Sequence, residues 1–178
     1  MIAGLEDISG GTLKIGDRVV NDLPPKDRDI AMVFQSYALY PHMTVYDNMA
    51  FALKLRHASK EEIDKKVKEA AEILDITQYL GRKPKALSGG QRQAITLLMA
   101  ALKQPKLLLL DEHTAALDPK TAAKVLEISD KIIAENQLTA MMVTHNMKDA
   151  IVHGNRLIMM HEGKVIYDVA EKRRRIFR

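Results

Sequence analysis

The second half of the chain alternates short apolar runs with longer amphipathic segments, and no other feature constrains the fold as strongly. The run Leu107–Leu110 is followed by an amphipathic segment over residues 119–133, and a second apolar run spans Leu138–Thr144. Strands without polar alternation are typical of parallel sheets whose two faces are both covered by helices. The order strand, helix, strand therefore predicts an α/β domain built on a parallel sheet.

The first half predicts a hairpin and one more strand of that sheet. Thr12–Ile15 and Arg18–Val20 are short strand-forming segments, and Gly16-Asp17 is the turn between them. Ile30–Phe34 is a compact apolar run bounded by polar residues. This pattern indicates a buried strand that ends at Gln35.

Side chains that can cap a helix precede the amphipathic segments. Thr44 and Ser59 begin two helices in the first half, and Glu62 completes a capping box with Ser59. Asp118 and Pro119 begin the helix that follows the strand at 107–110. The inward stripes of the second and the last of these helices are expected to contain Ile63, Val67, Ala70, Ala71, Leu74, Ala122, Val125, Leu126, Ser129, Ile132 and Ile133.

The last part of the chain predicts a short helix and then an edge hairpin. The hairpin strands are Arg156–Met160 and Lys164–Asp168, with Glu162-Gly163 as their turn. The methionine pairs Met141-Met142 and Met159-Met160 fall on apolar strands, so we expect them to fill the core.

Polar residues come directly after three of the predicted strands, at Gln35, Asp111-Glu112 and His145. In open parallel sheets, ligands bind beyond the carboxyl ends of the strands. Asp111 is placed to hold Mg²⁺ through water and Glu112 to act as base for an attacking water, which suits phosphoryl transfer. His145 would hydrogen-bond a γ-phosphate oxygen, and Gln35 would touch the metal or the water. The alternative for each is an ordinary polar residue at a strand end.

The segment Leu87–Gln91 (Leu-Ser-Gly-Gly-Gln) opens a helix that extends to about Lys103. Ser88 and Gln91 can form a capping box, and Gly89-Gly90 leave backbone N–H groups open to an anion at the positive end of the helix dipole. The alternative is an ordinary capped helix start. Two glycines lower helix stability without a packing gain visible in the sequence, which favours phosphate contact.

Charge and composition exclude several classes of function. The net charge of +4 resides in residues 171–178, which hold five basic side chains and one acidic one, so the rest of the chain is neutral. A neutral body argues against nucleic acid as a partner, and we expect residues 171–178 to form a disordered basic tail. The chain has no cysteine, which excludes disulfides, thiolate catalysis and cysteine-ligated zinc.

Five segments resemble the motifs of the nucleotide-binding subunits of ABC transporters and occur in the same order. They are Gln35 (Q-loop), Leu87–Gln91 (signature), Leu107–Glu112 (Walker B), Ala116–Asp118 (D-loop) and His145 (H-loop). The resemblance covers nearly the whole chain up to about residue 169, and residues 1–93 look like the carbohydrate-importer branch. It implies a P-loop-NTPase-like ATPase core over residues 1–170, with a helical subdomain inserted at about residues 40–95.

The resemblance also implies cofactors, partners and roles. ATP and Mg²⁺ would be the cofactors, and the protein would lie in the cytoplasm on the inner face of the membrane. Two subunits would pair head to tail with ATP between one P-loop and the partner's signature, and about Ser36–Leu55 would contact the transporter's membrane subunits. The implied site residues are Glu112 and His145 as catalytic groups, Asp111 and Gln35 at the metal, and Gln35, Ser88, Gly89, Gly90, Gln91 and Asp118 at the nucleotide. Within one chain, Asp118 has helix capping as its alternative role.

The sequence departs from the family at the P-loop. It contains no Gly-x-x-x-x-Gly-Lys-[Ser/Thr]: Gly10-Gly11-Thr12 lacks the lysine, and Gly163-Lys164-Val165 lacks the rest. In family terms the chain begins about forty residues late, without the P-loop strand and most of its helix, which cradle the triphosphate. We therefore expect an incomplete ATP site, low stability of the isolated chain and exposed apolar surface.

A second departure begins at Ala94. From this residue the chain looks more like another importer branch, and His113 stands where proline is usual in the family. This leads to the hypothesis that the chain combines two parents joined near Gly90–Gln93.

The sequence therefore predicts an ATP-binding subunit of an ABC-type importer, truncated at its start, whose intact form couples ATP hydrolysis to uptake of a solute, with carbohydrate as the favoured class. One alternative is a non-catalytic partner that offers its signature in trans to an intact subunit. Another is a soluble ABC-type protein that acts on nucleic acid or ribosomes, for which only the basic tail argues.

Overall fold

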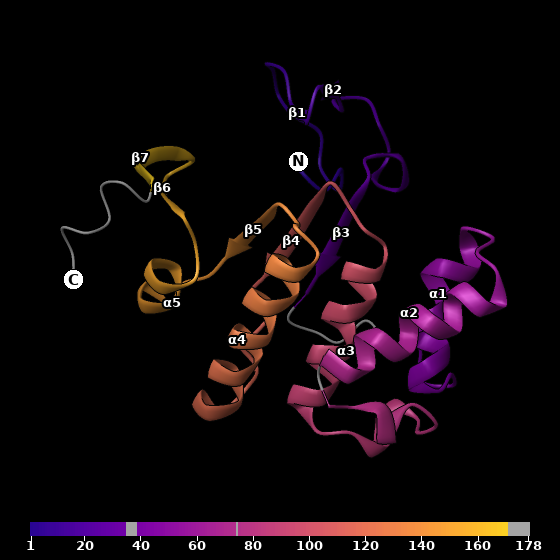
Figure 1. Cartoon of the computed structure of the whole chain (residues 1–178). Helices are drawn as coiled ribbons and strands as arrows, with labels where there is room; N and C mark the ends of the chain where they lie inside the picture. The colour runs from indigo at the N-terminus through magenta and orange to yellow at the C-terminus, as the bar shows by residue number, and fades with distance from the viewer. Residues whose placement is uncertain (35–38, 74, 171–178) are drawn as a thin grey trace.

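A computed structural model describes residues 1–34, 39–73 and 75–170 (Figure 1). The sequence-based expectations for Gln35, Leu74 and residues 171–178 lie outside these ranges. The central sheet has three parallel strands in the order β3-β4-β5, which confirms the predicted α/β class. Its strands are β3 (Ile30–Val33), β4 (Leu107–Asp111) and β5 (Ala140–Val143).

Helices pack on this sheet and on one another. The longer helices are α1 (Val45–Leu55), α2 (Lys60–Ile73), α3 (Gly89–Leu102) and α4 (Pro119–Glu135). Helix α3 packs against β3 and α4, and α1 and α2 also pack against α3 (Figure 1). Three short 3-10 helices span Pro25–Asp27, Thr77–Tyr79 and Pro84–Ala86. The main core joins these elements through fully buried side chains, including Val33, Met49, Val67, Ile95, Leu97, Leu108 and Ile132.

The predicted capping side chains begin all four of these helices. In each helix, a side-chain oxygen accepts a hydrogen bond from a backbone N–H of the first turn. The pairs are Thr44 with Asp47 at 3.0 Å, Ser59 with Glu62 at 3.2 Å, Ser88 with Gln91 at 3.2 Å, and Asp118 with Thr121 at 3.1 Å. These contacts confirm the helix starts that the sequence predicts.

Two hairpins flank the core. Strands β1 (Lys14–Ile15) and β2 (Arg18–Val19) pair antiparallel, as expected. Helix α5 (Met147–Val152) precedes strands β6 (Arg156–His161) and β7 (Lys164–Ala170), which form a separate two-stranded sheet. Figure 1 shows this hairpin beside α5, set apart from the three-stranded sheet.

The methionine pairs depart from their expected place in the core. Met141 and Met160 are 36% and 62% exposed, so the expectation is wrong for these two residues, while Met142 and Met159 are partly buried. The physical reason is the sheet arrangement. Within the described residues β5 pairs only with β4, and β6 and β7 pair only with each other, so their apolar side chains lack the cover of a continuous sheet.

Candidate active site

Two of the predicted site residues meet at the carboxyl ends of β4 and β5. The strands are in parallel register, with Asp111 opposite Val143, and the N–H of Glu112 donates to the carbonyl of Val143 at 3.0 Å. The Nδ1 of His145 lies 2.7 Å from Oε2 and 2.9 Å from Oε1 of Glu112. The spacing of 33 residues in the sequence thus becomes a direct contact.

The Glu112–His145 pair has a defined hydrogen-bond direction. An ionised carboxylate only accepts, so the Nδ1 of His145 carries the hydrogen. The side chain of His145 is 78% exposed and that of Glu112 is 29% exposed. The Glu112 side chain is therefore partly buried, while most of the His145 imidazole remains accessible to a ligand. An acidic group hydrogen-bonded to an imidazole is an arrangement that can accept and orient a proton.

The backbone at Glu112 is unusual for a residue with a side chain. Its φ is 49°, in the left-handed region that non-glycine residues rarely adopt. The residue is held on both sides, since its N–H donates to Val143 and its carbonyl accepts from the N–H of Ala115 at 3.0 Å. The turn after β4 thus points the carboxylate toward the end of β5.

Asp111 is the residue that the sequence predicts as a ligand of Mg²⁺. It ends β4 and is partly buried. Mg²⁺ in nucleotide sites is held by one or two carboxylates together with phosphate oxygens. Among the described residues, no group of three or more His, Asp or Glu side chains could hold a metal ion. The donor set therefore fits Mg²⁺ only when phosphate oxygens complete it, and the sequence holds no P-loop that would position them.

The start of α3 and the start of α4 lie together. Ser88 accepts from the N–H of Gln91, and the side chain of Gln91 accepts from the N–H of Ser88 at 2.9 Å, which confirms the capping box. A Cβ added at Gly90 would come within 2.4 Å of the Cγ2 of Thr121 in the first turn of α4. Gly90 thus has a packing role, which corrects the inference that the glycines bring no packing gain.

Asp118 lies in the same region as the capping residue of α4. Its carboxylate accepts from the N–H of Thr121. Hydrogen bonding with the side chain of Thr121, followed by that with its backbone, lowers the pKa of Asp118 below its usual value. The capping role expected as the alternative is therefore present in the structure. Among the described residues, no hydrogen bond joins the α3 start or Asp118 to the Glu112–His145 pair.

His113 is a buried residue whose place the sequence does not reveal. It is 3% exposed, and its Nε2 lies 3.1 Å from the Oγ of Ser129 on α4. Burial lowers the pKa of His113 to about 4, against a smaller opposing effect of Asp149. The sequence signals are its position directly after the acidic pair and the family's usual proline at this position, and neither predicts burial.

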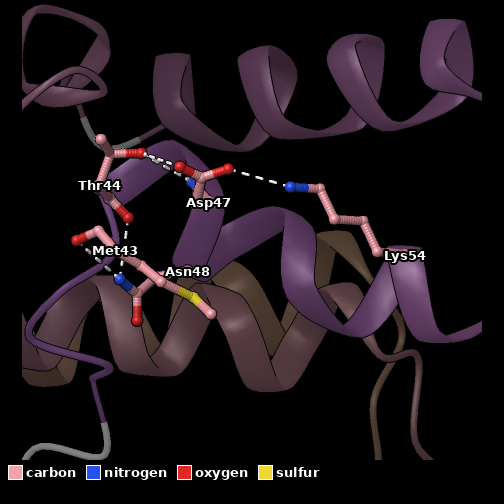
Figure 2. A network of polar contacts seen from close by, with 5 residues as sticks. All are labelled: Met43, Thr44, Asp47, Asn48 and Lys54. Carbon is pink, nitrogen blue, oxygen red and sulfur yellow. Dashed lines mark hydrogen bonds and ion pairs between the residues drawn. The ribbon is translucent and has the colours of Figure 1, made fainter.

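The described part of the predicted docking segment contains a polar network, shown in Figure 2. Asn48 is 1% exposed, and its Nδ2 lies 2.8 Å from the carbonyl of Thr44, 3.4 Å from that of Met43 and 3.1 Å from that of Tyr40. Its Oδ1 accepts from the N–H of Tyr40 at 2.8 Å. One buried amide therefore holds the loop before α1 against the helix.

A second part of this network is exposed. Asp47 accepts from the Nζ of Lys54 at 2.9 Å and from the hydroxyl of Thr44 at 2.8 Å (Figure 2). The Lys54 hydrogen bond, followed by that of Thr44, lowers the pKa of Asp47 below its usual value.

The described helices include none that is long and apolar enough to cross a bilayer.

The chain is similar to ATP-binding proteins of uptake, transport and import systems. The chain is 51% identical over 163 residues to the diacetylchitobiose uptake system ATP-binding protein MsiK of Streptomyces coelicolor, which is 92% of this chain and 43% of the relative. It is 54% identical to the multiple sugar-binding transport ATP-binding protein MsmK of Streptococcus mutans, over 92% of this chain and 44% of the relative. The trehalose/maltose import ATP-binding protein MalK of Thermococcus litoralis is 49% identical over 92% of this chain and 45% of the relative.

The chain spans about half the length of the curated relatives it matches. Each alignment includes Gly90–Gln93, where the two parents would be joined. The two-parent hypothesis stays a prediction, which requires that the identity to a relative differ between the two sides of this junction. The model of the family described as ABC transporter matches residues 1–115. With the sheet, the capped Leu87–Gln91 helix start and the Glu112–His145 pair in place, this match shows that the chain belongs to the ABC transporter family.

Proposed function

We propose that the chain is an ATP-binding subunit of an ABC-type importer and that the complete protein couples ATP hydrolysis to uptake of a solute, with carbohydrate as the substrate class. The observation that carries the proposal is the contact of 2.7 Å between Glu112 and His145, next to Asp111 at the carboxyl ends of β4 and β5. The names of the relatives support the transport class, since they describe uptake or import of sugars. The protein would act in the cytoplasm, on the inner face of the membrane.

Each site residue would have a role that follows from the chemistry of its side chain. Glu112 would accept a proton from water, His145 would hydrogen-bond a phosphate oxygen, and Asp111, with Gln35, would take part in holding Mg²⁺. The start of α3 at Ser88–Gln91 and Asp118 would contact nucleotide bound to a second subunit. When bound, Mg²⁺-ATP would supply the phosphoryl group and the remaining metal ligands.

A second candidate function is that of a non-catalytic partner. The sequence contains no P-loop motif, whereas its Leu-Ser-Gly-Gly-Gln segment is complete and capped. A subunit of this kind would place its α3 start over nucleotide held by a P-loop-bearing subunit. The nucleic-acid alternative is disfavoured, because the relatives named above are transport proteins and the body of the chain is neutral.

Partner docking would use about Ser36–Leu55. In its described part, Tyr40 is 39% exposed and Leu55 67% exposed, and Asn48 holds the loop that contains Tyr40. A preorganised loop loses less conformational freedom on binding than a flexible one. Cross-linking from a cysteine placed at Tyr40 to transporter membrane subunits tests this contact, with a cysteine at the exposed Glu127 of α4 as the control position.

The test of the proposed function is binding of Mg²⁺-ATP to the chain alone and mixed with an intact P-loop-bearing subunit. We expect weak binding to the chain alone and tighter binding with hydrolysis in the mixture. Glu112→Gln should abolish hydrolysis in the mixture if the chain's own site is catalytic. Loss through Ser88→Arg, with no effect of Glu112→Gln, identifies the non-catalytic partner. No response in the mixture refutes both functions.

A further inference from the structure

The residue after Glu112 is a buried histidine that makes a directional contact to another element. His113 is 3% exposed and lies opposite Ser129, which is 2% exposed in the middle of α4. Buried polar side chains in a core need hydrogen-bond partners, and an apolar residue would fill the same volume without this requirement. The polar character of this position therefore calls for a reason beyond packing.

The direction of the contact follows from a second hydrogen bond. The hydroxyl of Ser129 donates to the carbonyl of Val125 at 2.8 Å, so its hydrogen is already used. The oxygen of Ser129 must then accept from the Nε2–H of His113 at 3.1 Å. This chain of two hydrogen bonds fixes the imidazole ring to the backbone of α4.

His113 is therefore the third anchor of a strained turn. The Glu112 backbone has a φ of 49° and is tied to β5 by its N–H bond to Val143. A backbone in the left-handed region persists where the surrounding contacts over-determine it. The His113 contact supplies the constraint on the side of α4, one residue beyond the strained position.

We propose that His113 is a positioning residue: its hydrogen bond to Ser129 holds the turn after β4 so that the Glu112 carboxylate meets His145. The consequence for catalysis rests on the proposed function, because Glu112 acts there as the base. The positioning itself concerns only side chains of this chain and can be measured without nucleotide.

The experiment measures which ring nitrogen of His145 carries the hydrogen, by nitrogen-15 NMR at pH 8 of the full chain with labelled histidines. The His145 signals are assigned by their loss in His145→Asn. In the wild-type chain the contact with Glu112 places the hydrogen on Nδ1 of His145. Ser129→Ala removes the acceptor and His113→Leu removes the donor. Both variants should lose the Nδ1–H signal and shift the ring toward the Nε2–H form.

Two controls separate positioning from a general loss of stability. His113→Gln keeps an N–H donor near the place of Nε2 and should retain the wild-type His145 signals. Val67→Ala opens a cavity in α2, where Val67 is fully buried, and should leave the His145 signals unchanged although the chain unfolds more easily. If His113→Leu does not fold, Ser129→Ala alone decides.

The proposal is overturned if the folded Ser129→Ala chain keeps the Nδ1–H signal, if His113→Gln loses it as His113→Leu does, or if Val67→Ala loses it as well. Because no nucleotide is present, these outcomes are independent of the binding test of the proposed function. Failure to bind ATP with a positive NMR result refutes the importer function and leaves the positioning role of His113.

Discussion

Gly90 in the first turn of α3 lies against Thr121 in the first turn of α4, with 2.4 Å between an added Cβ and the Thr121 Cγ2. Gly90→Ala should therefore force the helices apart. Overpacking costs about 1–3 kcal/mol, and the better helix propensity of alanine returns about 1 kcal/mol. We expect a net loss of up to about 2 kcal/mol in the free energy of unfolding, measured by urea titration.

The matched control for this prediction is Thr121→Ser, which removes the Cγ2 methyl and leaves the backbone N–H that caps α4 in place. In this background Gly90→Ala should be neutral or stabilising, since only the propensity gain remains. An equal loss in both backgrounds would show that the contact with Thr121 is not the cause.

The buried imidazole of His113 should make stability depend on pH. Burial lowers its pKa to about 4 from 6.5. Between these values the unfolded chain binds a proton that the folded chain does not, so the free energy of unfolding falls as the pH decreases from 6.5 to 4. The linkage amounts to about 3 kcal/mol. Urea titrations at pH 7.5, 6, 5 and 4.5 measure it.

His113→Leu is the comparison, because leucine does not titrate. Its free energy of unfolding should fall less than that of the wild-type chain over the same range. The described carboxylates with lowered pKa, including Asp47 and Asp118, stabilise the fold above their ordinary pKa of 3.8 and lose this effect only at lower pH. Parallel curves for the two chains between pH 6.5 and 4.5 would contradict the assignment to His113.

The buried amide of Asn48 should control the loop before α1. Asn48→Asp replaces its N–H donors by a carboxylate oxygen that faces the carbonyls of Tyr40 and Thr44. We expect a loss of about 2–3 kcal/mol in the free energy of unfolding and faster proteolysis within residues 39–44. Lys54→Ala, which breaks only the exposed pair with Asp47 in Figure 2, should cost at most about 1 kcal/mol and leave proteolysis unchanged.

Local features of this fold are predictable from the sequence because they depend on neighbours in the chain. Caps such as Thr44 and Asp118 act on N–H groups three residues away, and Leu107–Leu110 is apolar because it is buried on both faces. The contact of Glu112 with His145 is predictable for a similar reason, since both residues end adjacent parallel strands.

Features that depend on contacts between elements distant in sequence are not predictable in this way. The packing role of Gly90 requires the position of Thr121, and the burial of His113 requires that Ser129 of α4 lie above the turn. The exposure of Met141 depends on which strands pair with β5, and periodicity does not report pairing. The polar contacts of Asn48 likewise leave no mark in the hydrophobic pattern.

The unpaired edge of β5 should make the isolated chain associate. Within the described residues one edge of β5 has no partner strand, and Met141 and Val143 are 36% and 50% exposed there. Exposed apolar edge strands pair with other chains, and an edge lysine opposes this. Met141→Lys should therefore reduce the oligomer fraction in light scattering after size-exclusion chromatography.

The matched substitution is Leu55→Lys at the end of α1, where leucine is 67% exposed and lies on a helix instead of a strand. Both variants replace one exposed apolar side chain by lysine, so they change net charge equally. If association arises at β5, only Met141→Lys lowers it. An equal decrease in both variants would mean that charge, and not the strand edge, governs association, and no oligomer in the wild-type chain would refute the prediction outright.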